Sequence, residues 1–322
     1  MKRLILLAAA GLLAVAAPSA AQDGVWPKHT VSVVVPFSAG GTTDMFARIF
    51  TTDVQAKYGQ PFVVENKVGA GGTVGASAAA KADKEGYTLL VGTASTHAIA
   101  PYVYKSLRYD AEKDFQPISL FAKVPNLLVV SNNLPIKSVQ ELIDYAKANP
   151  GKLNFGSSGI GSSPHLAAEL FQAMAGVQFN HVPYKASNEV MAALIGGHVD
   201  LAFDNVTSAL PHAKAGAMRA LGLTGPDSTP AAPELPTIAA TLPGFDAQSW
   251  HGLFAPAGTP KPIVEQIAAD VKRIIGQPAV DAKLKEIGAV PAPMTPDEFA
   301  AFGASERAKY EKIVAKAGIT PQ

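Results

Sequence analysis

Strand-like runs that pass through a loop of small residues into a helical pattern recur along this chain, and this alternation constrains the fold most. Val31 to Val35 is a run of valine broken by one serine, which is typical of a strand buried on both faces. The loop Ser38 to Thr42 follows, and apolar residues from Met45 to Phe50 then recur at helical spacing, with Thr42 or Thr43 placed as a cap. Strands that alternate with helices predict an α/β fold with parallel-rich sheets flanked by helices.

The rest of the chain repeats this scheme. We expect further strands at 62–64, 88–91, 127–130, 153–155 and 199–203, and helices at 76–82, 139–148, 164–174, 188–195, 262–275 and 296–317. Ser163 and Ser187 are placed to cap the helices that follow them, the first with Pro164 as its first helical residue. The last two helices have no strands of their own to cover, so we expect them to return to the first sheet.

The first 21 residues have the pattern of a secretory signal peptide. Lys2 and Arg3 precede an apolar run, Leu4 to Ala17, and small residues lead to an expected cleavage site after Ala21. The alternative is an uncleaved anchor, but the run is short and rich in alanine for a membrane span. We therefore expect a periplasmic protein whose mature chain has about 300 residues, which is enough for two domains.

Charge and cysteine content exclude several classes of partner and site. The chain carries 27 basic and 26 acidic residues, which gives no reason to expect a nucleic acid or an anionic membrane surface as partner. It contains no cysteine, which excludes a thiol nucleophile, a thiolate metal site and a lipid-anchored lipoprotein. The seven histidines show no His-x3-His pair, so a catalytic zinc is unsupported, and we expect no metal and no cofactor.

Three glycine-rich loops, 38–42, 69–72 and 156–163, each precede a helix. The N-terminus of a helix presents unpaired N–H groups and a partial positive charge, so it attracts anions, and serine and threonine add hydroxyl donors. One such loop is explained as an ordinary turn, which needs glycine in any case. Three loops, two of them rich in hydroxyl groups, indicate a cleft that binds a carboxylate without an arginine. Doubly wound sheets place such a cleft beyond the carboxyl ends of their strands.

Motifs of common enzymes are incomplete in this sequence. Ser158 has Gly156 before it, but Ile160 stands where a nucleophile elbow needs glycine. The glycines at 69–72 miss the spacing of a dinucleotide-binding loop, and no Walker A sequence is found. The remaining enzymatic alternative is a secreted serine hydrolase whose nucleophile lies in the loop Gly156 to Ser163 and whose partners come from distant segments. The sequence otherwise predicts binding without catalysis.

Four side chains near the expected strand ends need separate interpretation. His97 either lines the cleft or caps the next turn, and His165 lies in a first helical turn, where it faces ligand or solvent. Asp44 is expected to interact with its own helix end and to pair with Arg48 one turn later. Asp204, at the end of a strand, either accepts a hydrogen bond from a ligand amine or hydroxyl or bonds nearby backbone N–H groups.

Short motifs occur in a fixed order along nearly all of the mature chain. They are PFSAGGTTD at 36–44 with Ala47-Arg48, Glu65-Asn66, GAGG at 69–72, GYTL at 86–89, Asp114-Phe115 with Pro117-Ile118, GSSG at 156–159 with Gly161-Ser162 and His165-Leu166, HVPYK at 181–185, Trp250 with Gly252, and APAGTP at 255–260. In this order the motifs resemble the Bug family, the extracytoplasmic solute receptors of tripartite tricarboxylate transporters.

The resemblance implies a two-domain periplasmic binding protein fold, or flytrap, with a cleft between the domains. We expect a discontinuous first domain at 24–123 and 249–322 and a second domain at 124–248. The implied function is capture of a small organic, amino or aromatic acid, without catalysis, and its delivery to integral membrane subunits of a transporter. The other partner open to such a receptor is a sensor. We expect the protein to be a monomer.

The resemblance also implies a set of ligand-binding residues. The loops after the first strand of each domain hold the carboxylate, and the loop 93–97 and the region of Asp204 meet the rest of the ligand. The expected residues are Phe37, Ser38, Ala39, Gly40, Gly41, Thr42, Thr93, Ser95, Thr96, His97, Ser157, Ser158, Gly159, Gly161, Ser162, Ser163, His165, Tyr184 and Asp204. One corner departs from the family: Ala186-Ser187 stands where glycine and then proline are usual, and alanine restricts the turn relative to glycine.

Overall fold

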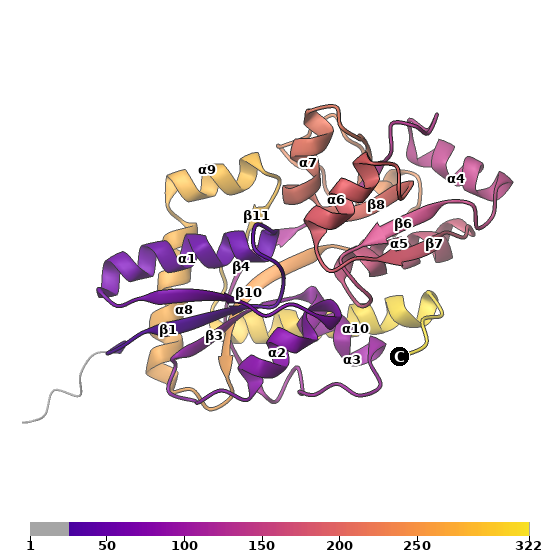
Figure 1. The fold of residues 1–322 in the computed structure, drawn as a ribbon. Helices are drawn as coiled ribbons and strands as arrows, with labels where there is room; N and C mark the ends of the chain where they lie inside the picture. The colour runs from indigo at the N-terminus through magenta and orange to yellow at the C-terminus, as the bar shows by residue number, and fades with distance from the viewer. Residues whose placement is uncertain (1–25, 322) are drawn as a thin grey trace, which may run out of the picture.

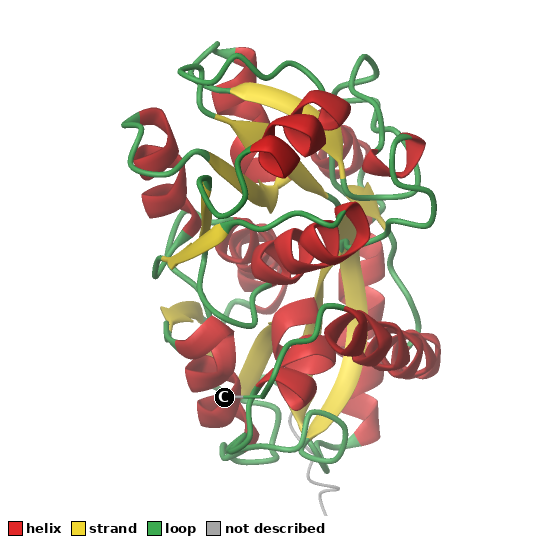
Figure 2. Ribbon diagram, turned by 90° about the vertical axis from the view of Figure 1, so that its right-hand side faces the viewer, coloured by secondary structure: helices red, strands yellow, loops and turns green. Residues whose placement is uncertain are grey.

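The strands form two separate sheets, and helices lie on both faces of each sheet (Figures 1 and 2). The computed structural model describes residues 26–321, so the expected signal peptide at 1–21 lies outside the described residues. The six-stranded sheet contains β1 (Val31–Val35), β2 (Phe62–Asn66), β3 (Thr88–Thr93), β4 (Phe115–Val124), β10 (Ser249–Pro256) and β11 (Val290–Pro291), in the order β11-β4-β10-β3-β1-β2. The five-stranded sheet contains β5 (Asn126–Val130), β6 (Asn154–Ser157), β7 (Asn180–Pro183), β8 (Leu201–Asn205) and β9 (Arg219–Leu223), in the order β7-β6-β8-β5-β9.

Each sheet with its helices is one domain. The first domain contains α1 (Thr42–Tyr58), α2 (Thr73–Ala80), α3 (Ala100–Val103), α8 (Lys261–Ile275), α9 (Pro278–Glu286), α10 (Pro296–Lys316), the short η1 (Ala70–Gly72) and the π-helical turn η2 (Ser95–Ile99). The second contains α4 (Val139–Ala148), α5 (Ser163–Ala175), α6 (Ser187–Ile195), α7 (Val206–Lys214) and η3 (Ile238–Ala240). Every helix expected from the sequence is present, whereas α3, α9 and α7, which contains Pro211, were not predicted.

Both sheets are mixed, which corrects the expectation of largely parallel sheets. β1 pairs in parallel with β2 and β3, and β6 pairs in parallel with β7 and β8. In contrast, β10 runs antiparallel to β3 and β4, and β5 runs antiparallel to β8 and β9. Parallel neighbours need a helical crossover. β4 passes into β5 with only Pro125 between them, and β9 reaches β10 through an irregular segment, so these strands enter their sheets without one.

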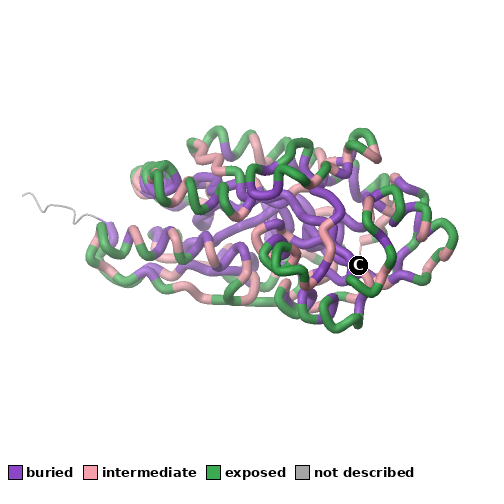
Figure 3. The backbone as a smooth tube through the Cα atoms, turned by 90° about the horizontal axis from the view of Figure 1, so that it is seen from above, coloured by how far each residue is buried: buried purple, intermediate pink, exposed green. Residues whose placement is uncertain are grey.

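The valine run of β1 is buried on both faces because each face of its sheet carries its own core. Val33 belongs to the core that includes Phe46 and Phe50 of α1. Val34 points to the opposite core, which includes Ile99 of η2 and Tyr310 of α10. Figure 3 shows the same layering, with buried strands between outer helices that are exposed on one side.

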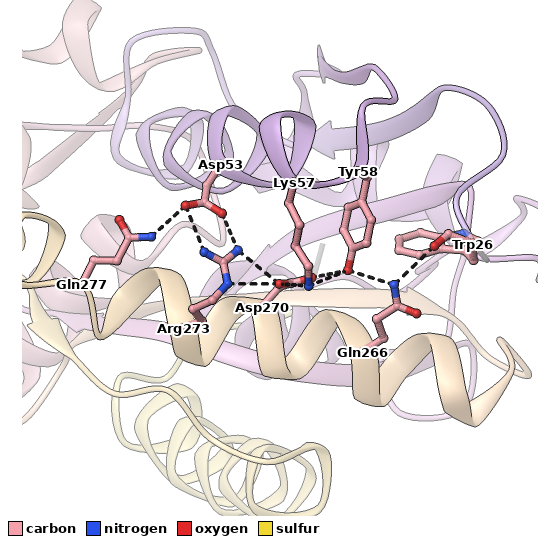
Figure 4. A network of polar contacts seen from close by, with 8 residues as sticks. All are labelled: Trp26, Asp53, Lys57, Tyr58, Gln266, Asp270, Arg273 and Gln277. Carbon is pink, nitrogen blue, oxygen red and sulfur yellow. Dashed lines mark hydrogen bonds and ion pairs between the residues drawn. The ribbon is translucent and has the colours of Figure 1, made fainter.

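The C-terminal helices return to the first domain. α8 packs against β4 and α1, and a polar network joins α8 to α1 (Figure 4). At its centre, the buried carboxylate of Asp270 accepts hydrogen bonds from Lys57 at 2.6 Å, from Tyr58 and from Arg273, while Arg273 also pairs with Asp53. α10 packs against β4 and also reaches α5 of the second domain. No helix within residues 26–321 is long and apolar enough to cross a membrane.

Candidate ligand-binding site

A cavity of about 280 Å³ lies between the two domains, at the carboxyl ends of β1, β3, β6 and β8. The first domain contributes the loop from Phe37 to Gly41 and the first turn of α1, and the second contributes the first turns of α6 and α7. Ser249 and His251 complete the wall, because β10 runs antiparallel to β3 and therefore begins beside the end of β3. The volume is at the lower end of the range for small-molecule sites, so the cavity suits a small ligand.

Three helices begin at this cavity without a side chain that caps them. α1 begins after Gly41, α6 after Ala186 and α7 after Asn205, and none of these residues makes a side-chain cap hydrogen bond. The first-turn residues that line the cavity are Thr42, Thr43, Ser187, Asn188, Thr207 and Ser208. Uncapped N–H groups and the macrodipole give each helix start a partial positive charge. The three ends together favour an anion in the cavity.

The starts of α1 and α7 meet across the cavity. Thr42 Oγ1 lies 2.6 Å from Thr207 Oγ1 and 3.2 Å from Ser208 Oγ. Two like helix ends this close repel each other, and an anion between them removes that repulsion. No lysine or arginine of the described chain lines the cavity, so helix ends and hydroxyl groups supply its positive potential.

The start of α5 differs from those three ends because its donors are already paired. Its N-cap is Ser162, whose hydroxyl accepts from the N–H of His165; the sequence interpretation placed the cap at Ser163 and is wrong by one residue. The N–H of Ser163 donates to Ser95 Oγ of the first domain at 3.0 Å, and the following proline has no N–H. The first turn of α5 therefore offers no free amide to an anion.

Asp204 is the acidic side chain of the cavity wall within the described residues, and its two oxygens differ. Oδ1 accepts from the Ser187 hydroxyl and from the Asn205 N–H, both at 2.7 Å, whereas Oδ2 is buried and lacks a partner in the described chain. Burial raises the pKa of Asp204 to about 6, against the opposing effect of these two hydrogen bonds. Ser187 was expected to cap α6, but the N-cap is Ala186, and the Ser187 hydroxyl is turned towards Asp204.

Asp44 serves its own helix end, as the sequence predicted. Its carboxylate accepts from the N–H of Gly40 at 3.0 Å and pairs with Arg48 at 2.7 Å. Burial alone raises the pKa of Asp44, but hydrogen bonds from Arg48, Gly40 and Asn66 together hold it below its usual value. The expected cap at Thr42 or Thr43 is absent, because the helix N-cap is Gly41. Asp44 instead fixes the loop that precedes the helix.

The predicted histidines lie behind the cavity wall. His97 is buried in η2, where its ring stacks on Phe254 with centroids 3.9 Å apart. His165 stacks on His181 with centroids 4.4 Å apart, and its Nδ1 accepts from the N–H of Gly161. Burial lowers the pKa of His97 and of His165 to about 3, so both rings are neutral at pH 7. Both histidines shape the loops that carry the wall.

The predicted ligand-binding residues fall into two groups. Those that line the cavity are Phe37, Ser38, Ala39, Gly40, Gly41, Thr42, Thr93, Ser95, Ser158, Ser163 and Asp204. Those outside its wall are Thr96, His97, Ser157, Gly159, Gly161, Ser162, His165 and Tyr184. Gly159 and Tyr184 line a neighbouring cavity of about 580 Å³, which also contains the 69–72 loop and shares Phe37 and Ser158 with the first. Direct contact of any of them with a ligand stays a prediction.

Sequence reasoning missed Thr207, Ser208 and His251. The two hydroxyl residues follow β8, which ends at Asn205, just as the other hydroxyl-rich loops follow strands. Pro211 obscures the helical pattern of α7, which they begin. His251 reaches the wall only through the antiparallel pairing of β10 with β3, and no local pattern encodes that pairing.

The departure at Ala186 carries no conformational penalty. Its φ is −151° and its ψ is 154°, which is extended backbone that any residue adopts. The expectation that alanine restricts this turn relative to glycine is therefore wrong. The chemical difference at this corner lies one residue later, where the Ser187 hydroxyl donates to Asp204 and a proline has no hydroxyl.

Several hydrogen bonds join the two domains beside the cavity. Besides the Thr42 contact, the N–H of Ser163 donates to Ser95, and Tyr104 Oη donates to the carbonyl of Ile160 at 2.7 Å. Gly71 lies beneath the same carbonyl, so close that an added Cβ comes within 2.5 Å of that oxygen. The domains are thus in contact at more than one place beside the cavity.

The serines of the 156–163 loop do not form a catalytic pair at the cavity. Ser157 Oγ lies 2.6 Å from His181 Nε2, but Ser157 is fully buried and outside the cavity wall. Burial lowers the pKa of His181 to about 4. Ser158 and Ser163, which line the cavity, have no histidine within hydrogen-bond distance in the described chain.

Residues 46–319 match the family described as "Tripartite tricarboxylate transporter family receptor". The chain belongs to this receptor family. Protein BugT of Bordetella pertussis is 35% identical over 316 residues, which cover 98% of this chain and 95% of that protein. Among solved structures, Rpa4515 of R. palustris with adipate has a TM-score of 0.90 at 41% identity, over 92% of this chain and 100% of that one. MatC of Rhodopseudomonas palustris with bound malate has a TM-score of 0.84 at 35% identity, over 90% of this chain and 100% of that one.

Membership in the tripartite tricarboxylate transporter receptor family decides between solute binding and catalysis, which the sequence left open. Receptors of this family are periplasmic solute-binding proteins with two domains, and they are not enzymes. The serine hydrolase alternative is thereby overturned. The structure gives a physical reason, because Ser157, the serine with a histidine side-chain partner in the described part of the chain, is buried outside the cavity wall.

Proposed function

We propose that this protein captures a small carboxylate in the interdomain cavity and delivers it to the membrane subunits of a tripartite tricarboxylate-type transporter. The observation that supports this most is the meeting of three uncapped helix starts at a cavity whose described wall has no lysine or arginine. Backbone amides and hydroxyls that are already in place bind a carboxylate well. The relatives solved with adipate and with malate support the same class of ligand.

The proposal includes export and a monomeric state. Residues 1–21 serve as a cleaved signal peptide, which agrees with the periplasmic location of the family's receptors. Both walls of the cavity come from one chain, so no second copy is needed to complete it. Domain boundaries at 24–123 with 249–322 and at 124–248 agree with the packing of α8 and α10 on β4.

Binding is tested by calorimetric titration of the mature protein with a series of mono- and dicarboxylates. At least one acid should bind saturably at one site per chain and remain chemically unchanged after long incubation. A folded protein that binds no member of the series contradicts the proposed ligand class. Conversion of a bound acid into a product contradicts a purely receptor role.

Delivery is tested in cells with the acid that binds. Deletion of the gene should abolish high-affinity uptake of that acid, and the wild-type gene should restore it. The variant Gly41→Val, which alters the cavity loop, should be exported and folded but should fail to restore uptake. Uptake that continues at the wild-type rate in the deletion strain would remove the transport role and leave binding intact.

A further inference from the structure

Several buried polar atoms at the cavity lack a partner within the described chain. They are Thr93 Oγ1, Asp204 Oδ2, Asn205 Oδ1 and His251 Nε2, and all four residues line the cavity. Thr93, Asp204 and His251 are almost completely buried. A buried polar group without a hydrogen bond costs about 1–3 kcal/mol, so such groups gather where a ligand supplies the partner.

The orientation of Asp204 is fixed by the protein itself. Ser187 Oγ and the Asn205 N–H both donate to Oδ1, and Asp204 lies 1% exposed at the end of β8. Because Oδ1 is held from two directions, the carboxylate is fixed, and Oδ2 is left as the unpaired acceptor of a residue that lines the cavity. Ser187 is on α6 and Asp204 on β8, so the hydroxyl also joins two elements of the second domain.

The protein provides no cation for that oxygen. No lysine or arginine of the described chain lines the cavity, and the other titratable side chains in its wall are His212 and His251. Burial lowers the pKa of His251 to about 3, so its ring stays neutral. Burial raises the pKa of Asp204 only to about 6, so above that pH the carboxylate is ionised and accepts hydrogen bonds without donating one.

We infer that the ligand carries, beside its carboxylate, an ammonium or hydroxyl group that donates to Asp204 Oδ2, and that Ser187 is the residue that positions Asp204 for this contact. The inference rests on the proposed function and narrows its ligand to amino- or hydroxy-substituted acids. The carboxylate binds at the helix starts, which carry partial positive charge, and the donor group binds at the single acidic oxygen. The helix starts and the acidic oxygen thus select for different groups of one molecule.

Matched acids test this selectivity. Succinate, malate and aspartate share one carbon skeleton and carry hydrogen, hydroxyl and ammonium at the second carbon; glutarate, 2-hydroxyglutarate and glutamate form a longer series. In calorimetric titration of the wild-type protein at pH 7.5, a substituted acid should bind about 10- to 100-fold more tightly than its unsubstituted partner. The two substituted members show whether the donor is a hydroxyl or an ammonium.

Two variants separate a direct role from a structural one. In Asp204→Asn the amide oxygen accepts the two hydrogen bonds now made by Oδ1, which leaves an NH2 donor in place of Oδ2. The preference should therefore disappear, mainly because the substituted acid binds more weakly. Ser187→Ala should reduce the preference in part, whereas a purely structural role lowers the affinity for both acids equally. Asp227→Asn, an exposed change of the same charge, should leave both affinities unchanged.

The outcomes distinguish this inference from the proposed function. Equal affinity for substituted and unsubstituted acids in the wild-type protein overturns the inference and leaves carboxylate capture intact. Parallel loss of both affinities in Asp204→Asn, with an unchanged unfolding curve, also overturns it. Failure of every acid to bind overturns the proposed function and this inference together. If Asp204→Asn does not fold, the inference is still tested by the ratio of affinities for substituted and unsubstituted acids in the wild-type protein and in Ser187→Ala.

Discussion

Thr42 Oγ1 and Thr207 Oγ1 lie 2.6 Å apart, although the two residues are 165 positions apart in the chain and begin helices of different domains. The contact joins the two domains across the cavity. It joins two uncapped helix starts, and both threonines line the cavity. We therefore expect contact between the domains and binding of the proposed anion to involve the same two helix ends.

Removal of this contact should weaken ligand binding without weakening the separate domains. Thr42→Val keeps the shape of the side chain and deletes its hydroxyl, so affinity should fall about 5- to 10-fold, the value of one hydrogen bond of about 1 kcal/mol. Thr207→Val should cost a similar amount, and the double variant should lose little more, because either change breaks the same pair. Calorimetric titration measures the cycle, with the exposed Thr52→Val on the same helix as control. Fully additive losses contradict the pairing.

Two adjacent glycines should respond differently to the same substitution. Gly41 has a φ of −82°, and an added Cβ meets only the Ser38 carbonyl at 3.4 Å, so Gly41→Val leaves the fold unstrained. Its side chain projects at the cavity loop, so ligand affinity should fall at least about 10-fold while the unfolding temperature of the apo protein changes little. Gly40 has a φ of 79°, so Gly40→Ala should lower apo stability by about 1 kcal/mol.

Measurement of apo unfolding and ligand affinity on the same preparations separates these effects. A folded Gly41→Val protein with wild-type affinity removes this loop from the binding site. A loss of apo stability in Gly41→Val that equals the loss in Gly40→Ala shows instead that both glycines only shape the turn.

Gly71→Ala should hold the domains apart. An added Cβ lies 2.5 Å from the Ile160 carbonyl of the other domain and 3.0 Å from Tyr104 Oη, so the closed arrangement has no room for it. Affinity should fall about 10-fold or more, and small-angle scattering of the ligand-bound protein should show a larger radius of gyration than for wild type. Gly59→Ala is the matched control, because Gly59 has a φ of 65°, close to the 60° of Gly71, and open space around its Cβ. Equal behaviour of the two variants contradicts a steric role for Gly71 in closure.

Apo stability should fall as the pH decreases from 7 to 5. His97, His165 and His251 have pKa values lowered by burial from 6.5 to about 3, so their contribution is complete above pH 6.5 and is lost as the pH falls below it. Between pH 7 and pH 5, each histidine lowers the free energy of unfolding by about 2 kcal/mol. Asp204 acts in the opposite direction, because its pKa is raised from 3.8 to about 6. Over the same interval it raises the free energy of unfolding by only about 1.4 kcal/mol. The histidines therefore dominate.

Denaturant unfolding at several pH values tests this balance, and Asp204→Asn isolates the carboxylate. The variant should be more stable than wild type at pH 7.5, where wild type buries a charge, and this advantage should disappear at pH 5. A wild-type protein that becomes more stable towards pH 5 contradicts the dominance of the buried histidines.

Local sequence signals determined the strand, loop and helix units. The valine run of β1, the glycines of the 38–42 loop and the apolar spacing of α1 lie within about 20 residues, and each reports the conformation of its own segment. The Asp44–Arg48 pair was predictable for the same reason, since helical geometry alone brings positions i and i+4 together. The sequence also predicted that the hydroxyl-rich loops lie at the carboxyl ends of the strands, because parallel strands bring such loops to one edge of the sheet.

Tertiary structure decided which of these groups face the ligand. Ser163 and Ser187 are both hydroxyl residues at helix starts. The N–H of Ser163, however, donates to Ser95 of the other domain, whereas the hydroxyl of Ser187 donates to Asp204. The antiparallel entry of β10, which brings His251 to the wall, and the meeting of Thr42 with Thr207 depend on contacts between distant segments. The sequence by itself determined the secondary structure of each segment, because secondary structure depends on residues a few positions away. The packing of the two domains determined which donors remain free, because a donor pairs with whichever acceptor the fold brings within reach.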